Sequence, residues 1–95
     1  MINAKLEKKN RIEDLLGSKA RVKILALLAK ENELNISSII RKTHLNHSIV
    51  VKHLKKLIAA NLAQEKKFGR IRIYRFKTEN LKARSLKNFI EIWEK

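Results

Sequence analysis

Apolar residues recur at helical spacing through most of the first 60 positions of this chain. The pattern predicts helices over residues 4–16, 19–30, 36–42 and 47–60. The second of these is apolar around most of its circumference, which is typical of a central helix. Ser18, Asn35 and Asn46 are residue types that cap helix N-termini, and each precedes a predicted helix. Gly17 and Asn61 accept a left-handed conformation, so each is expected to end the helix before it.

The spacing changes after residue 60 to that of a β-hairpin. Strands are predicted over residues 62–67 and 71–77, and the second is rich in β-branched and aromatic side chains. Residues 68–70 include a glycine and supply the turn. Thr78 is a candidate cap for a last helix over residues 79–94. The chain is therefore expected to be mainly α, with a small β-hairpin.

Composition and length narrow the classes of function. Ninety-five residues, 44 % of them hydrophobic, suffice for one small domain with a thin core, which favours a partner chain. No apolar run of about 18 residues is present, so no membrane partner is expected. The chain opens without a secretory leader, which favours a cytoplasmic location. There is no cysteine, no phosphate-cradling glycine loop and no Ser–His–acid set, so an enzyme is not expected.

The positive charge is concentrated in the middle of the chain. Of the formal net charge of +14, residues 41–77 carry +10, from eleven Lys and Arg against the single acid Glu65. Residues 1–40 carry +3 and residues 78–95 carry +1. A surface charged only for solubility would spread these charges, whereas contacts to phosphates require them to be clustered. A nucleic acid is therefore the expected partner.

The order of predicted elements, α-α-α-α-β-β-α, is that of a winged helix-turn-helix domain. Residues 47–60 are the expected recognition helix in the major groove, and residues 66–72 the wing, which reaches the adjacent minor groove or backbone. His53 is expected to pack or to contact the DNA backbone, and Tyr74 and Phe76 to lie in the core. The candidate DNA contacts are polar or basic side chains of the helix and the wing: Asn46, His47, Ser48, Lys52, Lys55, Lys56, Lys66, Lys67, Arg70 and Arg72.

Three stretches of the chain resemble a known family. Residues 17–28, Gly-Ser-Lys-Ala-Arg-Val-Lys-Ile-Leu-Ala-Leu-Leu, resemble the opening helix of archaeal winged helix-turn-helix regulators similar to the ArsR group. Residues 48–62 resemble that family's recognition helix and its entry into the wing, and residues 67–74 resemble the wing itself. The resemblance covers residues 12–77. It implies a dimeric transcriptional regulator that binds a roughly palindromic duplex site.

The chain departs from the metal-sensing members of that group. Those members often place a cysteine pair in the helix before the recognition helix, where this chain has Ile36-Ser-Ser-Ile-Ile40. A thiolate sensor of soft metals is therefore excluded. Other members use His and carboxylates near the C-terminus, and the last helix here has no His. No metal and no cofactor are expected.

The whole chain, residues 1–95, is expected to form one domain with its core in residues 12–77. The terminal segments, 1–16 and 78–95, are expected to form the interface of a homodimer, although the last helix could simply cover the domain. The near-neutral charge of residues 78–95 lets two cationic chains approach, and large aromatic side chains suit an interface centre. The candidate interface residues are Leu6, Leu86, Phe89, Ile90 and Trp93.

Two other functions fit the same fold and charge. An architectural, nucleoid-associated protein would coat duplex DNA with little sequence preference, and a ribosome- or RNA-associated module would prefer structured RNA. The residues of the expected recognition helix help only slightly to decide between a sequence-specific regulator and an architectural protein. Asn46 and Lys52 can contact bases, but the helix has no Arg or Gln for further bidentate contacts.

Overall fold

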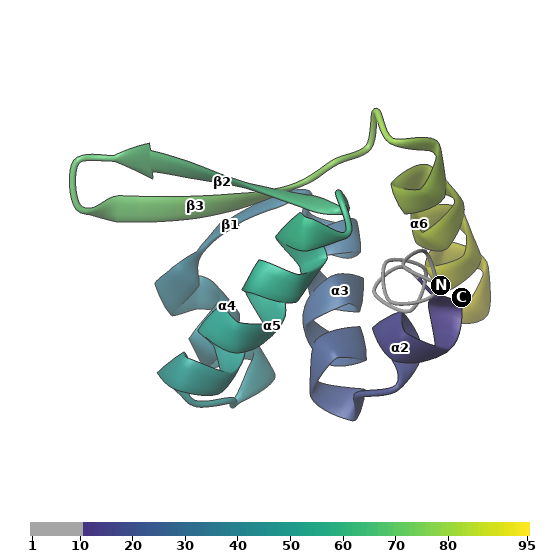
Figure 1. Cartoon of the computed structure of the whole chain (residues 1–95), viewed down its shortest axis with the longest axis horizontal. Helices are drawn as coiled ribbons and strands as arrows, with labels where there is room; N and C mark the ends of the chain where they lie inside the picture. Colours follow the sequence, from purple (N-terminus) through teal and green to yellow (C-terminus); the bar gives the residue numbers. More distant parts are fainter. Residues whose placement is uncertain (1–10) are drawn as a thin grey trace, which may run out of the picture.

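Five helices and a three-stranded antiparallel sheet make up residues 11–95, the part of the chain that the computed structural model describes (Figure 1). This is the winged helix-turn-helix order predicted from the sequence, with one additional strand. The expected helix over residues 4–16 is described only from Ile12 onward, and Leu6 lies outside the described residues. In chain order the elements are α2 (Ile12–Leu16), α3 (Lys19–Glu31), β1 (Glu33–Asn35), α4 (Ile36–Thr43), α5 (His47–Ala59), β2 (Ala63–Phe68), β3 (Ile71–Phe76) and α6 (Leu81–Trp93).

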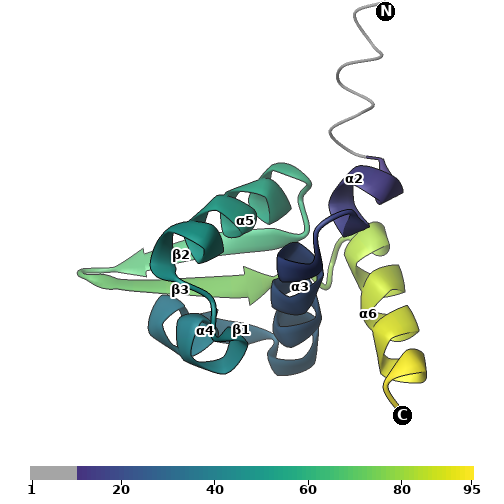
Figure 2. The ribbon, with the colours of Figure 1, turned by 90° about the horizontal axis from the view of Figure 1, so that it is seen from below.

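Helix α3 is the centre of the domain, as its broad apolar face predicts. It packs against the other four helices and against β1 and β3. Figures 1 and 2 show α2 and α6 on one side of α3, with α4, α5 and the sheet on the other side. The core that surrounds α3 includes the two aromatic side chains of β3, so Tyr74 and Phe76 pack inside the domain as expected. The largest buried side chains are Ile24, Leu25, Leu28, Ile39, Val50, Leu54, Leu57, Tyr74 and Phe76.

The sheet has the strand order β1-β3-β2, and β1 is the element that the sequence pattern misses. Its three residues are too few to show an alternating pattern, and they are in strand geometry because they pair with β3, with Leu34 opposite Tyr74. Asn32 makes this possible by taking a φ of 69° directly after α3, which reverses the chain. A hairpin is thus extended into a small sheet by a residue whose left-handed conformation ends the central helix.

The predicted hairpin is confirmed, and it extends beyond the helices (Figures 1 and 2). Phe68 pairs with Ile71, which leaves Gly69 and Arg70 as a two-residue turn. Gly69 has a φ of +60°, the conformation that a first central turn residue needs in a type II′ hairpin and that glycine adopts without strain. The wing therefore keeps a defined register to its end.

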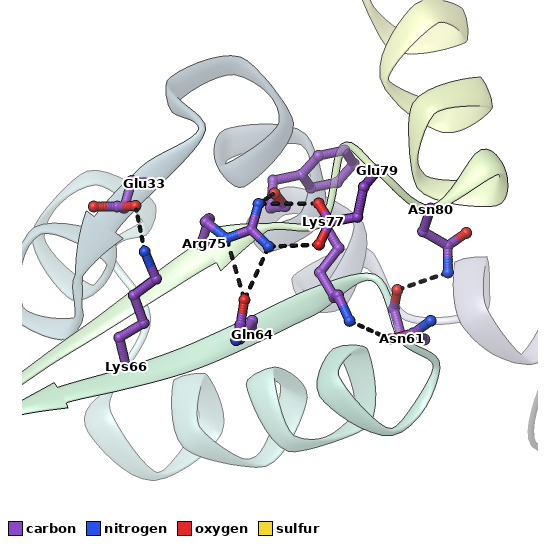
Figure 3. A network of polar contacts seen from close by, with 9 residues as sticks. Glu33, Asn61, Gln64, Lys66, Arg75, Lys77, Glu79 and Asn80 are labelled. Atoms are coloured by element: carbon purple, nitrogen blue, oxygen red, sulfur yellow. Dashed lines mark hydrogen bonds and ion pairs between the residues drawn. The ribbon is translucent and has the colours of Figure 1, made fainter.

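A polar network joins the base of the hairpin to the start of α6 (Figure 3). The guanidinium of Arg75 donates to Gln64 Oε1 at 2.9 and 3.2 Å and to the carboxylate of Glu79 at 2.6 and 3.0 Å. These hydrogen bonds from Arg75 are the main reason that the pKa of Glu79 falls to about 2. The Arg75–Glu79 ion pair is consequently present across the whole neutral range of pH.

The last helix starts two residues later than the sequence predicts. Asn80, not Thr78, is its cap, since Asn80 Oδ1 accepts from the backbone N–H groups of Lys82 and Ala83. Both residues are good caps, and the choice is made by a second hydrogen bond, from Asn80 Nδ2 to the backbone oxygen of Asn61 at 3.0 Å. Asn61 itself has the expected left-handed φ of 62°.

Gly17 ends α2 as predicted, but it does not take the expected left-handed conformation. Its φ of −74° and ψ of −4° are right-handed. The reason for a glycine is close approach, because a Cβ at this position would lie 2.6 Å from the backbone oxygen of Glu13. The turn from α2 into α3 is therefore too tight for any side chain at residue 17.

Arg21 is a buried cation, 8 % exposed, that joins three helices. Its Nη1 donates to the backbone oxygens of Asp14 and Leu15 at the end of α2. Its Nε lies 3.3 Å from Nδ1 of His53 on α5, which is also buried. The arginine thus meets the negative end of α2 and an imidazole nitrogen that accepts only when the ring is neutral.

This contact gives the fold a dependence on pH. Burial lowers the pKa of His53 first, and the nearby charges of Arg21, Lys52 and Lys56 lower it further. The pKa of His53 in the folded chain lies below the ordinary histidine value of 6.5, so at a pH between these two pKa values the unfolded chain binds more protons. The stability contributed by neutral His53 is present above pH 6.5 and lost as the pH falls through the folded pKa.

We expect the free energy of unfolding to fall as the pH is lowered below about 6.5, by at most about 1.4 kcal/mol per pH unit for this one group. Urea unfolding between pH 7.5 and 5 measures it. His53→Gln keeps an acceptor for Arg21 and should flatten the profile, whereas the exposed His44→Gln should not. A profile that is unchanged by His53→Gln would contradict the assignment.

Candidate nucleic-acid interface

Helix α5 is positioned by one buried face and one cap. Val50, His53, Leu54 and Leu57 form the buried face, at the spacing of a helix that packs along one side. His53 is therefore a packing residue. The tight turn before α5 places His44 at a φ of 60°, where its N–H closes α4 on the backbone oxygen of Ile40. The helix predicted over residues 47–60 is thus confirmed as His47–Ala59.

The face of α5 opposite to the core carries the polar and basic residues predicted from the sequence. Ser48, Lys52 and Lys55 follow one another at helical spacing on this side, with Lys56 beside them. All four are exposed, and none of these lysines forms an ion pair with a carboxylate of the described residues. The charge of this face is therefore available to a polyanion.

Asn46 and Ser48 have an additional role at the start of the helix. Asn46 Oδ1 accepts from the backbone N–H of Ile49 at 2.9 Å and from Ser48 Oγ at 3.0 Å. A bidentate contact of asparagine to adenine needs both the amide oxygen and the amide nitrogen. Because its oxygen is engaged in capping, Asn46 has only Nδ2 to offer to a base.

The wing separates its cations into two groups. Lys67 and Arg70 are exposed and form no ion pair with a carboxylate in residues 11–95. Lys66 Nζ lies 3.6 Å from Glu33 of β1, and Arg72 Nη2 lies 3.1 Å from Glu65 of β2. Of the four candidate contacts in the wing, two are thus cations without an ion pair in residues 11–95, and two are paired with carboxylates.

Glu65 is a residue whose function the sequence does not reveal. Its Oε2 accepts from the hydroxyl of Tyr74 at 2.6 Å as well as from Arg72. The hydrogen bond from Tyr74 is the largest cause that lowers the pKa of Glu65, while burial raises the pKa of Tyr74 to about 12. The carboxylate is therefore ionised and holds two residues of β3. Since Glu65 pairs with Tyr74 across the hairpin, correct strand register would have predicted this contact.

The candidate interface residues predicted on α6 divide into two groups. Leu86 and Ile90 are half-buried and pack against the core of their own chain. Phe89 and Trp93 are 57 % and 75 % exposed, with ring centroids 6.0 Å apart. Ile92, which the sequence analysis does not select, is 63 % exposed. Among residues 11–95, the apolar surface of α6 made of Phe89, Ile92 and Trp93 thus has no partner.

Other kinds of site are not found in the described part of the chain. Within residues 11–95, no group of three or more His, Asp or Glu side chains is arranged to hold a metal ion. His44 and His47 are both exposed and lie on either side of the turn between α4 and α5. None of the described helices is long and apolar enough to cross a membrane.

Comparison with known proteins points to one family. Residues 18–65 match the family model described as "Bacterial regulatory protein, arsR family". This segment runs from the cap of α3 into the first strand of the wing. Among curated proteins, none matches the chain.

Solved structures with the same fold cover nearly the whole chain. AF1382 from Archaeoglobus fulgidus is 28 % identical, with a TM-score of 0.67 over 90 % of this chain and 99 % of that one. The transcriptional repressor PagR of Bacillus anthracis is 24 % identical, with a TM-score of 0.71 over 93 % and 98 %. Mb0332 from Mycobacterium bovis, described as a homodimeric winged helix-turn-helix DNA-binding domain, is 24 % identical, with a TM-score of 0.73 over 97 % and 82 %.

Proposed function

Because this chain belongs to the arsR family of bacterial regulatory proteins, we propose that it binds duplex DNA as a dimeric transcriptional regulator. In this proposal α5 enters the major groove, and the wing contacts the adjacent minor groove or backbone. The similar PagR is a transcriptional repressor, and the similar Mb0332 domain is a homodimeric DNA-binding domain. Both descriptions support the proposal.

One observation carries the proposal. Five cations lie on the exposed side of α5 and in the outer half of the wing, and none is neutralised by a carboxylate of the described residues: Lys52, Lys55, Lys56, Lys67 and Arg70. Glu65, the single acid of residues 41–77, is engaged by Arg72 and Tyr74. A surface of this kind is suited to contact a row of phosphates.

The test is a binding titration at two salt concentrations, with the duplex upstream of the protein's own gene and a random duplex of equal length. A specific regulator should prefer one duplex by about a thousandfold or more. Equal affinities that fall steeply with salt would favour the architectural function, and preference for a structured RNA would favour the RNA-associated one. Absence of binding to any duplex would overturn the proposal.

Lys52→Ala and Arg70→Ala should each weaken binding to every duplex and reduce the slope of log K against log salt by about 0.9, because each variant removes one phosphate contact. Both side chains are exposed, so the thermal transition should not move. Arg84→Ala on α6 removes the same charge outside the proposed interface and is the matched control. If the control weakens binding as much as the two variants do, net charge and not position determines affinity.

Glu65→Gln should strengthen binding and make the salt slope steeper by about 0.9, because Arg72 then joins the cations that face phosphates. Glutamine retains an acceptor for the Tyr74 hydroxyl, so the wing keeps its shape. Glu79→Gln, which releases Arg75 at the base of the hairpin, adds the same charge and should leave the slope unchanged. Weaker binding by Glu65→Gln, with an unchanged thermal transition, would contradict this account.

We propose that the exposed surface of α6 forms the dimer interface, with Phe89 and Trp93 at its centre and Leu86 and Ile90 at its edge. An exposed pair of large aromatic rings is typical of an interface centre. In such a dimer the two recognition helices would lie about 34 Å apart, one turn of DNA. A cytoplasmic location goes with this function.

Trp93→Ala should raise the dissociation constant of the dimer by about thirtyfold, the effect of losing about 2 kcal/mol at an interface centre. Sedimentation equilibrium measures it, and the fold should be unaffected because the side chain is 75 % exposed. Glu91→Gln is the control, since it is exposed on another side of α6. An unchanged dimer would place the interface elsewhere.

A further inference from the structure

The tip of the wing carries two large apolar side chains that the fold does not use. Phe68 is 60 % exposed and Ile71 is 55 % exposed, and they face each other as the last pair of the hairpin. Neither belongs to the core or to the half-buried residues packed against it. By strand alternation they lie on the sheet face opposite to Tyr74. The packing of the domain thus gives these two side chains no role.

Basic residues flank this apolar pair. Lys67 precedes Phe68 and Arg70 precedes Ile71, and both are exposed without an ion pair to the described residues. The nearest carboxylate along either strand, Glu65, is held by Arg72 and Tyr74. The tip is also the part of the hairpin farthest from the helices in both views (Figures 1 and 2). An apolar pair flanked by cations fits a ligand with anionic edges and an apolar interior.

We propose that Phe68, with Ile71 beside it, is a wedge that enters the minor groove and partly unstacks one base step, while Lys67 and Arg70 contact the flanking phosphates. The proposal rests on the proposed function, because it requires that the chain binds duplex DNA. Apolar side chains inserted in this way kink the duplex, and the cost is lowest at flexible pyrimidine–purine steps. The wedge therefore favours DNA sequences whose base steps are easily kinked.

Helix α5 offers few side chains that distinguish one base from another. The recognition helix has no Arg or Gln, and the amide oxygen of Asn46 is engaged in capping, so bidentate base contacts are few. A wedge at the wing tip adds discrimination at a step where no hydrogen bond to a base is required. Preference for one duplex over another then depends on both elements.

The test uses duplexes that the full chain itself selects from a random pool. 2-Aminopurine is placed at each successive step of the flanking minor groove, and its fluorescence is measured at saturating protein. Unstacking should raise the fluorescence at one step in each half of the site. Energy transfer between dyes at the duplex ends should show a bend. Phe68→Ala should abolish both signals, and Phe68→Leu, which keeps an apolar wedge, should retain part of them.

Affinity and salt dependence separate this contact from a phosphate contact. Phe68→Ala should weaken binding by about five- to a hundredfold, the effect of losing one stacked aromatic side chain, without changing the salt slope. Its thermal transition should stay unchanged because the side chain is exposed. Arg70→Ala should change the slope but keep the 2-aminopurine signal at saturation. The pool selected by the wild-type protein should be enriched in TA and CA steps, and a pool selected by Phe68→Ala should not.

Three results would overturn the inference. One is a wild-type complex in which no step shows increased fluorescence, and another is the same signal in Phe68→Ala. The third is a change in the mass of the DNA-free protein in Phe68→Ala, which would make the tip a contact between two copies of the chain. Absence of binding to any duplex by the wild-type protein would instead overturn the proposed function.

Discussion

Helix α3 exposes little more than one side, which carries Lys19, Lys23 and Lys30, and the need to cover its other sides determines where both proposed functional surfaces lie. Ile24, Leu25 and Leu28 are at most 1 % exposed, and burying side chains of this size stabilises the fold by about 1.5–3 kcal/mol each. Other elements must therefore cover the apolar sides of α3. α5 covers one side and turns its own opposite face outward with Lys52 and Lys55, while α6 covers another and turns Phe89 and Trp93 outward. By covering the same helix, α5 presents a basic surface and α6 an apolar surface to the solvent.

Electrostatics works against this compact arrangement, because eleven cations and one acid share residues 41–77. The described residues resolve part of the repulsion by pairing four of these cations: Lys42 with Glu31, Lys66 with Glu33, Arg72 with Glu65 and Arg75 with Glu79. Three of these pairs involve the strands of the hairpin, and one of them, Arg75 with Glu79, lies at its base. Within residues 11–95 the outward side of α5 has no such pair, so the remaining repulsion is concentrated where phosphates would relieve it.

The helices, the caps Asn35 and Asn46 and the left-handed Asn61 were predictable from the sequence, because periodicity and capping are local properties. Strand β1 was not, since its conformation depends on a partner 40 residues away. The division of α6 was also beyond a sequence argument. Leu86 and Phe89 both follow the same helical spacing, and only the position of α3 decides which of them is covered. The pairing of Arg72 with Glu65 likewise required the register of the hairpin.

The wing and the surface proposed for dimerisation are not independent parts of the molecule. The side chain of Arg75 on β3 donates hydrogen bonds to Gln64 on β2 and to Glu79 just before α6. The side chain of Asn80 donates to the backbone of Asn61 at the start of the hairpin (Figure 3). With the pKa of Glu79 at about 2, the ion pair does not titrate near neutral pH. The orientation of α6 relative to the hairpin is thus fixed within one chain. In a dimer joined through α6, the spacing of two wings would follow from the packing of Phe89 and Trp93, so a change at that interface would move the wings on DNA without any substitution in them.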